Sequence, residues 1–205
     1  MLVSLALLWV GAAGAVRPPA DYRAVVTGAA AAELERLNAR GEFEAVLEHG
    51  ARFSKRVEPA GVVTYEMAYA ANRQGQLSEA LALYDRAIDE DPDLAAAFYD
   101  RGELRLERGD DADARADFLR AAALRPDHWA VHFRLAHMAG RAGDPQLLQE
   151  HLMEALRHGF DFRTITSDPD WRAWARDPKL GRVLQRLIVV YSDEAIWEVL
   201  LEEPR

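Results

Sequence analysis

The chain has 205 residues, of which 50% are hydrophobic and 29% charged, so its composition predicts a folded domain and excludes a mainly disordered chain. The formal net charge of -9 argues against nucleic acid as a partner, because nucleic acids attract basic surfaces. The sequence contains no cysteine, which excludes disulfides, zinc–thiolate sites and thiol nucleophiles.

The first segment of the chain reads as an export signal. Residues 1–16 carry no charged side chain and include an apolar run from Leu2 to Val10. Ala13-Gly14-Ala15 fits the small-x-small rule for cleavage, so we expect a signal peptide over 1–15 and a linker over 16–26. The apolar run is shorter than the roughly 20 residues that cross a bilayer as a helix. We therefore expect a periplasmic or secreted protein with no transmembrane segment in the mature chain.

An internal repeat of 34 residues follows. Shifting the sequence by this period superimposes Gly75 on Gly109 and Gly143, and it pairs Ala87 with Ala121 and Ala155. The same shift pairs further small, aromatic and proline positions, namely Ala68 with Gly102 and Ala136, Ala80 with Ala114, Tyr84 with Phe118, and Pro92 with Pro126. Glycine suits a turn after a first helix, small residues allow close helix packing, and proline ends the unit.

This pattern resembles the tetratricopeptide repeat, a helix-turn-helix unit of 34 residues. The resemblance implies an all-α, right-handed superhelical solenoid of antiparallel helix pairs. We place the repeats at 61–94, 95–128 and 129–160, with a degenerate unit at 27–60. Its glycine, Gly41, precedes Ala45 by four residues, one fewer than in the other units.

The period fails after Phe160, and a C-terminal helical cap over 161–205 is predicted. Asp168-Pro169 and Asp177-Pro178 are typical of helix starts. An apolar stripe at helical spacing follows, formed by Leu180, Val183, Leu184, Leu187 and Ile188, and a last helix is expected over about 193–202. The segment resembles the capping block of bacterial arrays of this family.

In the tetratricopeptide family, the first helices of the repeats line a concave groove that receives a peptide or a partner's helix. Carrying the groove positions over by the resemblance implies a partner-binding site formed by Tyr65, Tyr69, Asn72, Arg73, Tyr99, Glu103, Phe133 and His137. Aromatic side chains are enriched in protein interfaces, although tyrosines beside a helix contact are as often part of intramolecular packing.

We expect no catalytic, cofactor-binding or metal-binding residues. The sequence lacks a nucleophile elbow, a phosphate-binding loop and a dinucleotide fingerprint. His128 and His132 are four residues apart, but no third ligand follows at the spacing of a metal site. The basic residues Arg172, Arg176, Lys179, Arg182 and Arg186 are expected to pair with carboxylates or to remain solvated.

The resulting hypothesis is a non-catalytic adaptor or scaffold of the cell envelope that binds a protein or peptide in its groove. Two alternatives remain open. One is a self-associating homo-oligomer that uses Trp171, Trp174 and the last helix, and the other is an unrecognised enzyme.

Overall fold

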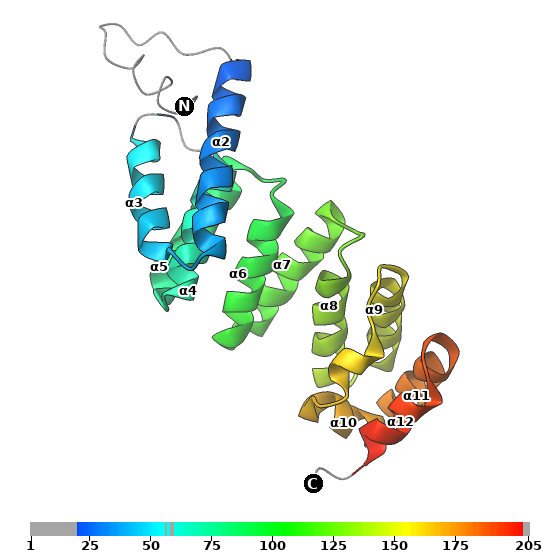
Figure 1. Cartoon of the computed structure of the whole chain (residues 1–205). Coiled ribbons are helices and arrows are strands. Elements are labelled where there is room, and N and C mark those ends of the chain that lie inside the picture. The colour runs from blue at the N-terminus through cyan, green and yellow to red at the C-terminus, as the bar shows by residue number, and fades with distance from the viewer. Residues whose placement is uncertain (1–19, 56, 58–59, 203–205) are drawn as a thin grey trace, which may run out of the picture. The chain divides into compact units, whose positions relative to one another are not determined.

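The structure is a computed structural model that describes residues 20–55, 57 and 60–202, and the predicted signal peptide at 1–15 lies outside them. The chain forms two compact units, Met1–Asp110 (unit 1) and Asp111–Arg205 (unit 2). All regular structure in the described residues is helical (Figure 1). Unit 1 contains α2 (Ala20–Ala39), α3 (Phe43–Ser54), α4 (Gly61–Arg73), α5 (Leu77–Glu90) and α6 (Ala95–Glu107). Unit 2 contains α7 (Asp111–Leu124), α8 (Trp129–Arg141), α9 (Pro145–Arg157), the 3-10 helix η2 (Phe162–Ile165), α10 (Pro169–Arg176), α11 (Leu180–Tyr191) and α12 (Glu194–Leu201).

The same glycine turn ends the first helix of each repeat. Gly41, Gly75, Gly109 and Gly143 all have a left-handed φ, between 69° and 75° at three positions and 82° at Gly109. The residue after each glycine donates its backbone N–H to a carbonyl five residues earlier at 2.9 Å, as Gln76 does to Ala71. This is the Schellman arrangement, which glycine adopts without the strain of a Cβ. The regular spacing of the glycines therefore corresponds to the same backbone turn at the end of each first helix.

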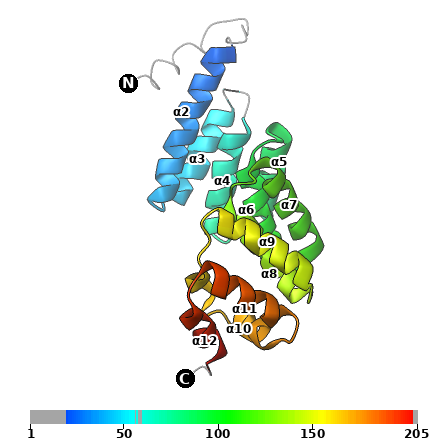
Figure 2. The ribbon, with the colours of Figure 1, turned by 90° about the vertical axis from the view of Figure 1, so that its right-hand side faces the viewer.

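Unit 1 is organised around α4, which packs most extensively against α5 and also contacts α2 and α3 (Figure 2). Ala68 on α4 and Ala80 and Ala87 on α5 are fully buried, so the two backbones approach closely. Tyr84 is also fully buried and supplies the bulk beside these alanines. The all-α architecture of consecutive packed helix pairs, which the tetratricopeptide resemblance implies, is confirmed in the described residues.

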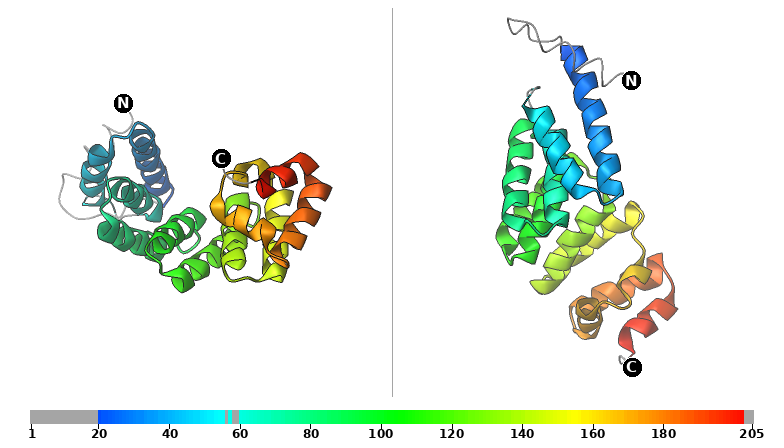
Figure 3. Two further views of the ribbon diagram at one scale, coloured as in Figure 1. Left: turned by 90° about the horizontal axis from the view of Figure 1, so that it is seen from below. Right: turned by 60° about the vertical axis from the view of Figure 1, so that its left-hand side comes forward.

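Unit 2 has its core where α8 and α9 meet the C-terminal helices α10, α11 and α12 (Figure 3). The predicted stripe on α11 is buried at all of its positions, from Leu180 to Ile188. Asp168 caps α10 as predicted, because its Oδ1 accepts the backbone N–H groups of Asp170 and Trp171. The fully buried Trp171 is the largest side chain of this core.

Two arginines of the predicted basic cluster bind backbone carbonyls instead of carboxylates. Arg172 donates to the carbonyl oxygens of Thr166 and Glu202, and Arg176 donates to those of Leu201 and Glu202. The carbonyls at the end of a helix lack intrahelical partners, and cations near that end are favourable. These arginines therefore fasten the end of α12 to α10.

The N-terminal boundary differs from the expectation. Helix α2 begins at Ala20, inside the segment 16–26 that the sequence predicts as a linker. Helix α2 as a whole is rich in alanine, a strong helix former, which favours a helix that extends into this segment. Within the described residues, no helix has the length and apolar character needed to span a bilayer.

Candidate functional site

Six of the eight residues predicted to bind a partner lie on α4 and α6 in unit 1. The hydroxyl of Tyr65 on α4 donates a hydrogen bond to Oδ2 of Asp100 on α6 at 2.8 Å. The Tyr65 ring also contacts the buried Tyr84, with ring centroids 6.2 Å apart. Burial and the neighbouring Asp100 charge raise the pKa of Tyr65, so its hydroxyl keeps its proton at neutral pH. The orientation of Tyr65 is therefore fixed from two sides.

The other predicted residues of unit 1 remain at least partly accessible. Tyr69 and Asn72 on α4 are half-buried, and Arg73 at the end of this helix is exposed. Tyr99 and Glu103 on α6 are half-buried. Tyr65 and Tyr69 are one helical turn apart and thus share a face of α4.

A buried polar link between α2 and α4 was missed by the sequence reasoning. Asn38 on α2 donates its Nδ2 to the backbone oxygen of Glu66 at 3.0 Å and to its carboxylate at 2.7 Å. Both residues are more than nine-tenths buried. Burial raises the pKa of Glu66, the hydrogen bond from Asn38 opposes this shift, and the Glu35 and Asp100 charges add to it. The one sequence feature that could have revealed this link is the glutamate Glu66, which lies on α4 between the buried residues Thr64 and Met67.

Phe133 and His137, the two predicted residues on α8, are covered by α10 of the same unit. The Phe133 ring stacks on Trp171 at a centroid distance of 5.4 Å and an interplanar angle of 15°. The His137 ring lies 5.1 Å from that of Trp174. A Cβ added at Gly140 would approach the Trp174 ring to 2.5 Å, so the indole occupies the space left by this glycine. The predicted groove positions on α8 therefore contact the chain's own tryptophans, and both residues are half-buried.

Side chains that could ligate a metal converge at one place in the described residues. Atoms of His137, Asp168 and Asp170 lie within 4.8 Å of one another, a grouping that spacing along the sequence did not reveal. Asp168 already caps α10, and His137 Nε2 lies 3.3 Å from Asp170 Oδ2. Burial lowers the pKa of His137, which keeps the ring neutral at neutral pH. Helix capping and this side-chain contact account for the arrangement without an ion.

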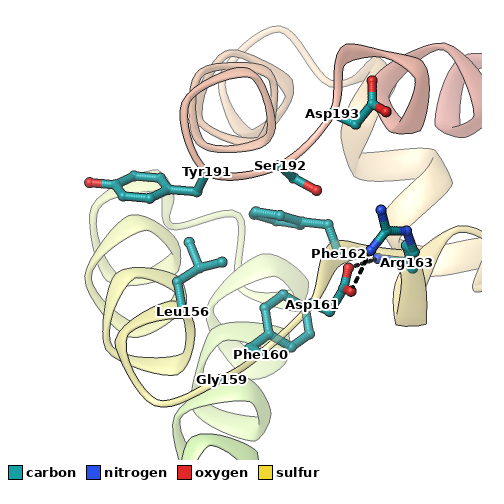
Figure 4. A pocket seen from close by; sticks show the side chains of 9 residues that line it. All are labelled: Leu156, Gly159, Phe160, Asp161, Phe162, Arg163, Tyr191, Ser192 and Asp193. Atoms are coloured by element: carbon teal, nitrogen blue, oxygen red, sulfur yellow. Dashed lines mark hydrogen bonds and ion pairs between the residues drawn. The ribbon is translucent and has the colours of Figure 1, made fainter.

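A hollow of about 450 Å³ lies in unit 2, where the chain leaves α9 and where α11 turns into α12 (Figure 4). Phe160, Phe162 and Leu156 form its apolar wall, and Asp161 pairs with Arg163 across 2.9 Å. Asp161 also accepts the backbone N–H of Arg163, and these contacts lower its pKa. Ser192 faces the hollow but has no hydrogen bond to a base in the described part of the chain. This lining therefore lacks a nucleophile–base pair.

Comparison with known proteins supports the repeat assignment. The tetratricopeptide repeat model matches residues 65–128 and 99–147. A tetratricopeptide repeat and J domain-containing co-chaperone of Fusarium oxysporum is 34% identical over 71 residues, which is 35% of this chain and 14% of the relative. A tetratricopeptide repeat-containing thioredoxin of Arabidopsis thaliana is 34% identical over 99 residues, covering 48% of this chain and 14% of the relative.

A third relative, a mouse DnaJ homolog of subfamily C, is 29% identical over 83 residues, covering 40% of this chain and 16% of the relative. The matches thus span less than a fifth of these relatives' own lengths. The matched stretch of this chain contains three of the equivalent glycine turns, at Gly75, Gly109 and Gly143. Turn geometry and sequence similarity agree that the chain contains tetratricopeptide repeats over residues 65–147.

Proposed function

We propose that the protein is a non-catalytic adaptor that binds a partner protein or peptide on the first helices of unit 1. We call this surface, formed by α2, α4 and α6, the α2–α4–α6 face. The observation that carries the proposal is the half-buried Tyr65 and Tyr69 on one side of α4, with Tyr65 held by Asp100. An aromatic side chain that is already oriented loses little entropy on binding. One similar protein is described as a co-chaperone, which fits a role in holding other proteins.

Capture of partners from the native cell by the full-length chain tests this proposal. Tyr69→Ala removes aromatic area without breaking the Tyr65–Asp100 hydrogen bond, and we expect it to weaken capture by about tenfold or more, as for an interface aromatic anchor. Leu119→Ala is the control, because Leu119 is an exposed apolar side chain of α7 in unit 2, outside this face. Retention of every captured partner by Tyr69→Ala combined with Tyr99→Ala would count decisively against the face.

We further propose that the adaptor works outside the cytoplasm, in the cell envelope. The support is the uncharged, apolar start of the sequence and the Ala13-Gly14-Ala15 triplet. Fractionation of the producing cells and N-terminal sequencing of the recovered protein provide the test. We expect a mature chain that begins at Val16, and an intact Met1 in the cytoplasmic fraction would refute export.

Self-association is the second candidate function, and the C-terminal helices give it a specific basis. Trp171 is fully buried, so it cannot form the contact surface named for this alternative. Exposed apolar side chains remain on α11 and α12, namely Val189, Val190, Tyr191, Val199 and Leu201. A monomer in sedimentation at high protein concentration would exclude this candidate, and a dimer that Val190→Glu dissociates would support it.

A further inference from the structure

The α2–α4–α6 face contains three carboxylates that form no ion pair with any described cation. Glu35 lies on α2, Glu66 on α4 and Asp100 on α6, and the charges of Glu35 and Asp100 both act on Glu66. None of the three forms an ion pair in the part of the chain that the structure describes. Acidic residues that are largely buried are normally paired, because an isolated charge loses its hydration without compensation. Glu66 is 9% exposed and departs from this rule.

A second observation at the same place points to a missing hydrogen-bond donor. Asn38 is 8% exposed, and its Oδ1 is buried without a hydrogen-bond partner although its Nδ2 is fully used by Glu66. Buried polar atoms are almost always satisfied in native proteins, so an orphaned acceptor calls for an explanation. The Asn38 oxygen and the Glu66 and Asp100 carboxylates are all hydrogen-bond acceptors, whereas the donors here, Asn38 Nδ2 and the Tyr65 hydroxyl, are already used. The site therefore has more acceptors than donors.

The chemistry of these acceptors selects the class of ligand. A single metal ion requires ligand atoms that converge on one point. Among the described residues, the group that converges in this way is His137, Asp168 and Asp170 in unit 2, not the carboxylates of this face. Acceptors spread over three helices suit a guanidinium, which carries five N–H donors in one plane and is more weakly hydrated than an ammonium. Tyr65 and Tyr69 border the site on α4, and tyrosine rings attract guanidinium groups.

We propose that this acceptor site binds an arginine side chain presented by the partner protein or peptide. The inference rests on the proposed function, since it names the chemistry that the α2–α4–α6 face recognises. The guanidinium donates to the carboxylates of Glu66 and Asp100 and approaches the orphaned oxygen of Asn38. Its positive charge supplies the ion pair that Glu66 and Asp100 lack among the described residues.

The direct test is an NMR titration of the full-length chain with a short, end-blocked Gly/Ser peptide that carries several arginines. The comparison peptides replace each arginine by citrulline, which keeps the shape without the charge, or by lysine. We expect the arginine peptide to bind about tenfold more tightly than the citrulline peptide, because charge-assisted hydrogen bonds are the stronger kind. It should also shift the side-chain amide signal of Asn38. Equal binding of arginine and citrulline peptides, or of arginine and lysine peptides, overturns the proposal.

A charge-removing variant separates a binding role from a structural one. Glu66→Gln combined with Asp100→Asn keeps the side-chain shapes, and we expect it to weaken arginine-peptide binding by about tenfold while raising the melting temperature. Glu79→Gln combined with Asp89→Asn removes the same charge from exposed positions on α5 and should leave both quantities unchanged. A lower melting temperature in the first variant would show that its carboxylates are structural and would overturn the proposal.

Capture of the native partner distinguishes failure of this inference from failure of the proposed function. Loss of the partner from Tyr69→Ala, together with full retention by the Glu66→Gln and Asp100→Asn variant, overturns the arginine site and leaves the binding face intact. Retention by both variants overturns the site and the face together. Loss from both, with capture unchanged in the α5 control, supports the site.

Discussion

Replacing Trp171 by alanine tests whether α10 is a structural part of unit 2. The indole is fully buried, stacks on Phe133 at 5.4 Å and meets Trp174 edge-on at 4.9 Å. Trp→Ala changes in cores cost about 3–5 kcal/mol, and complete burial with two lost aromatic contacts places this change near 4 kcal/mol. For a unit of this size, each kcal/mol shifts the melting temperature by about 4–8 °C. We therefore expect Trp171→Ala to lower it by at least 15 °C or so.

Urea unfolding followed by tryptophan emission is the suitable assay. Trp129, Trp171, Trp174 and Trp197 are all in unit 2, whereas the described part of unit 1 contains no tryptophan. Trp171→Phe is the matched control: it keeps an aromatic ring and removes the indole Nε1, which is buried without a hydrogen-bond partner. This control should cost much less than Trp171→Ala, because a phenyl ring still fills most of the site and the smaller cavity carries a smaller penalty. An unchanged unfolding midpoint in Trp171→Ala would refute the packing of α10 on α8.

Three further predictions concern the turns, the acidic cluster and the cap. Gly75→Ala should destabilise the protein by about 1–2 kcal/mol in urea unfolding, because alanine is strained at the φ of 75°. Gly28→Ala is the control: it lies inside α2, an added Cβ contacts no neighbouring atom there, and the change should stabilise the protein slightly. Burial raises the folded-state pKa of Glu66 and of Asp100, so the stability linked to their protonated forms is present at acidic pH and is lost as pH rises through the folded-state pKa values. The Glu66→Gln and Asp100→Asn variant should therefore have a higher unfolding free energy than the wild type at neutral pH. This difference in unfolding free energy should disappear toward about pH 4. Asp168→Ala should cost about 1 kcal/mol in thermal unfolding, whereas Asp168→Asn, which keeps a capping oxygen, should cost much less.

The repeat was readable from sequence because its constraints are local and recur. A left-handed glycine is required after each first helix, so Gly75, Gly109 and Gly143 recur at a fixed interval and the same backbone turn is found at each. Gly41 has this turn too, although the residues after it depart from the pattern. Local requirements of this kind can be recognised in a single sequence, because the same residue types recur at the same position of each repeat.

The candidate site was only partly predictable, because its decisive contacts join residues that follow no period. Asn38 and Glu66 are 28 residues apart, and nothing in the repeat pattern requires their hydrogen bond. The cover over Phe133 comes from Trp171, which lies outside the repeats. Sequence reasoning placed Phe133 and His137 among the partner-binding positions, with intramolecular packing as the alternative, because it treated each repeat alike. The tertiary contacts of α10 make the repeat on α8 different.

The covered face of α8 shows what kind of group fits the equivalent face of α4. Tyr65 and Phe133 occupy the same position two repeats apart, as Tyr69 and His137 do. On α8 these positions are met by flat indole rings, and Trp171 stacks nearly parallel to Phe133, at an interplanar angle of 15°. The residues on both helices are half-buried, but the described part of unit 1 contains no tryptophan that could contact Tyr65 and Tyr69 in the same way. A planar guanidinium can stack on such a face as an indole does, and it also brings a positive charge, with which Glu66 and Asp100 are not paired among the described residues. We therefore favour arginine over an apolar side chain as the group bound there.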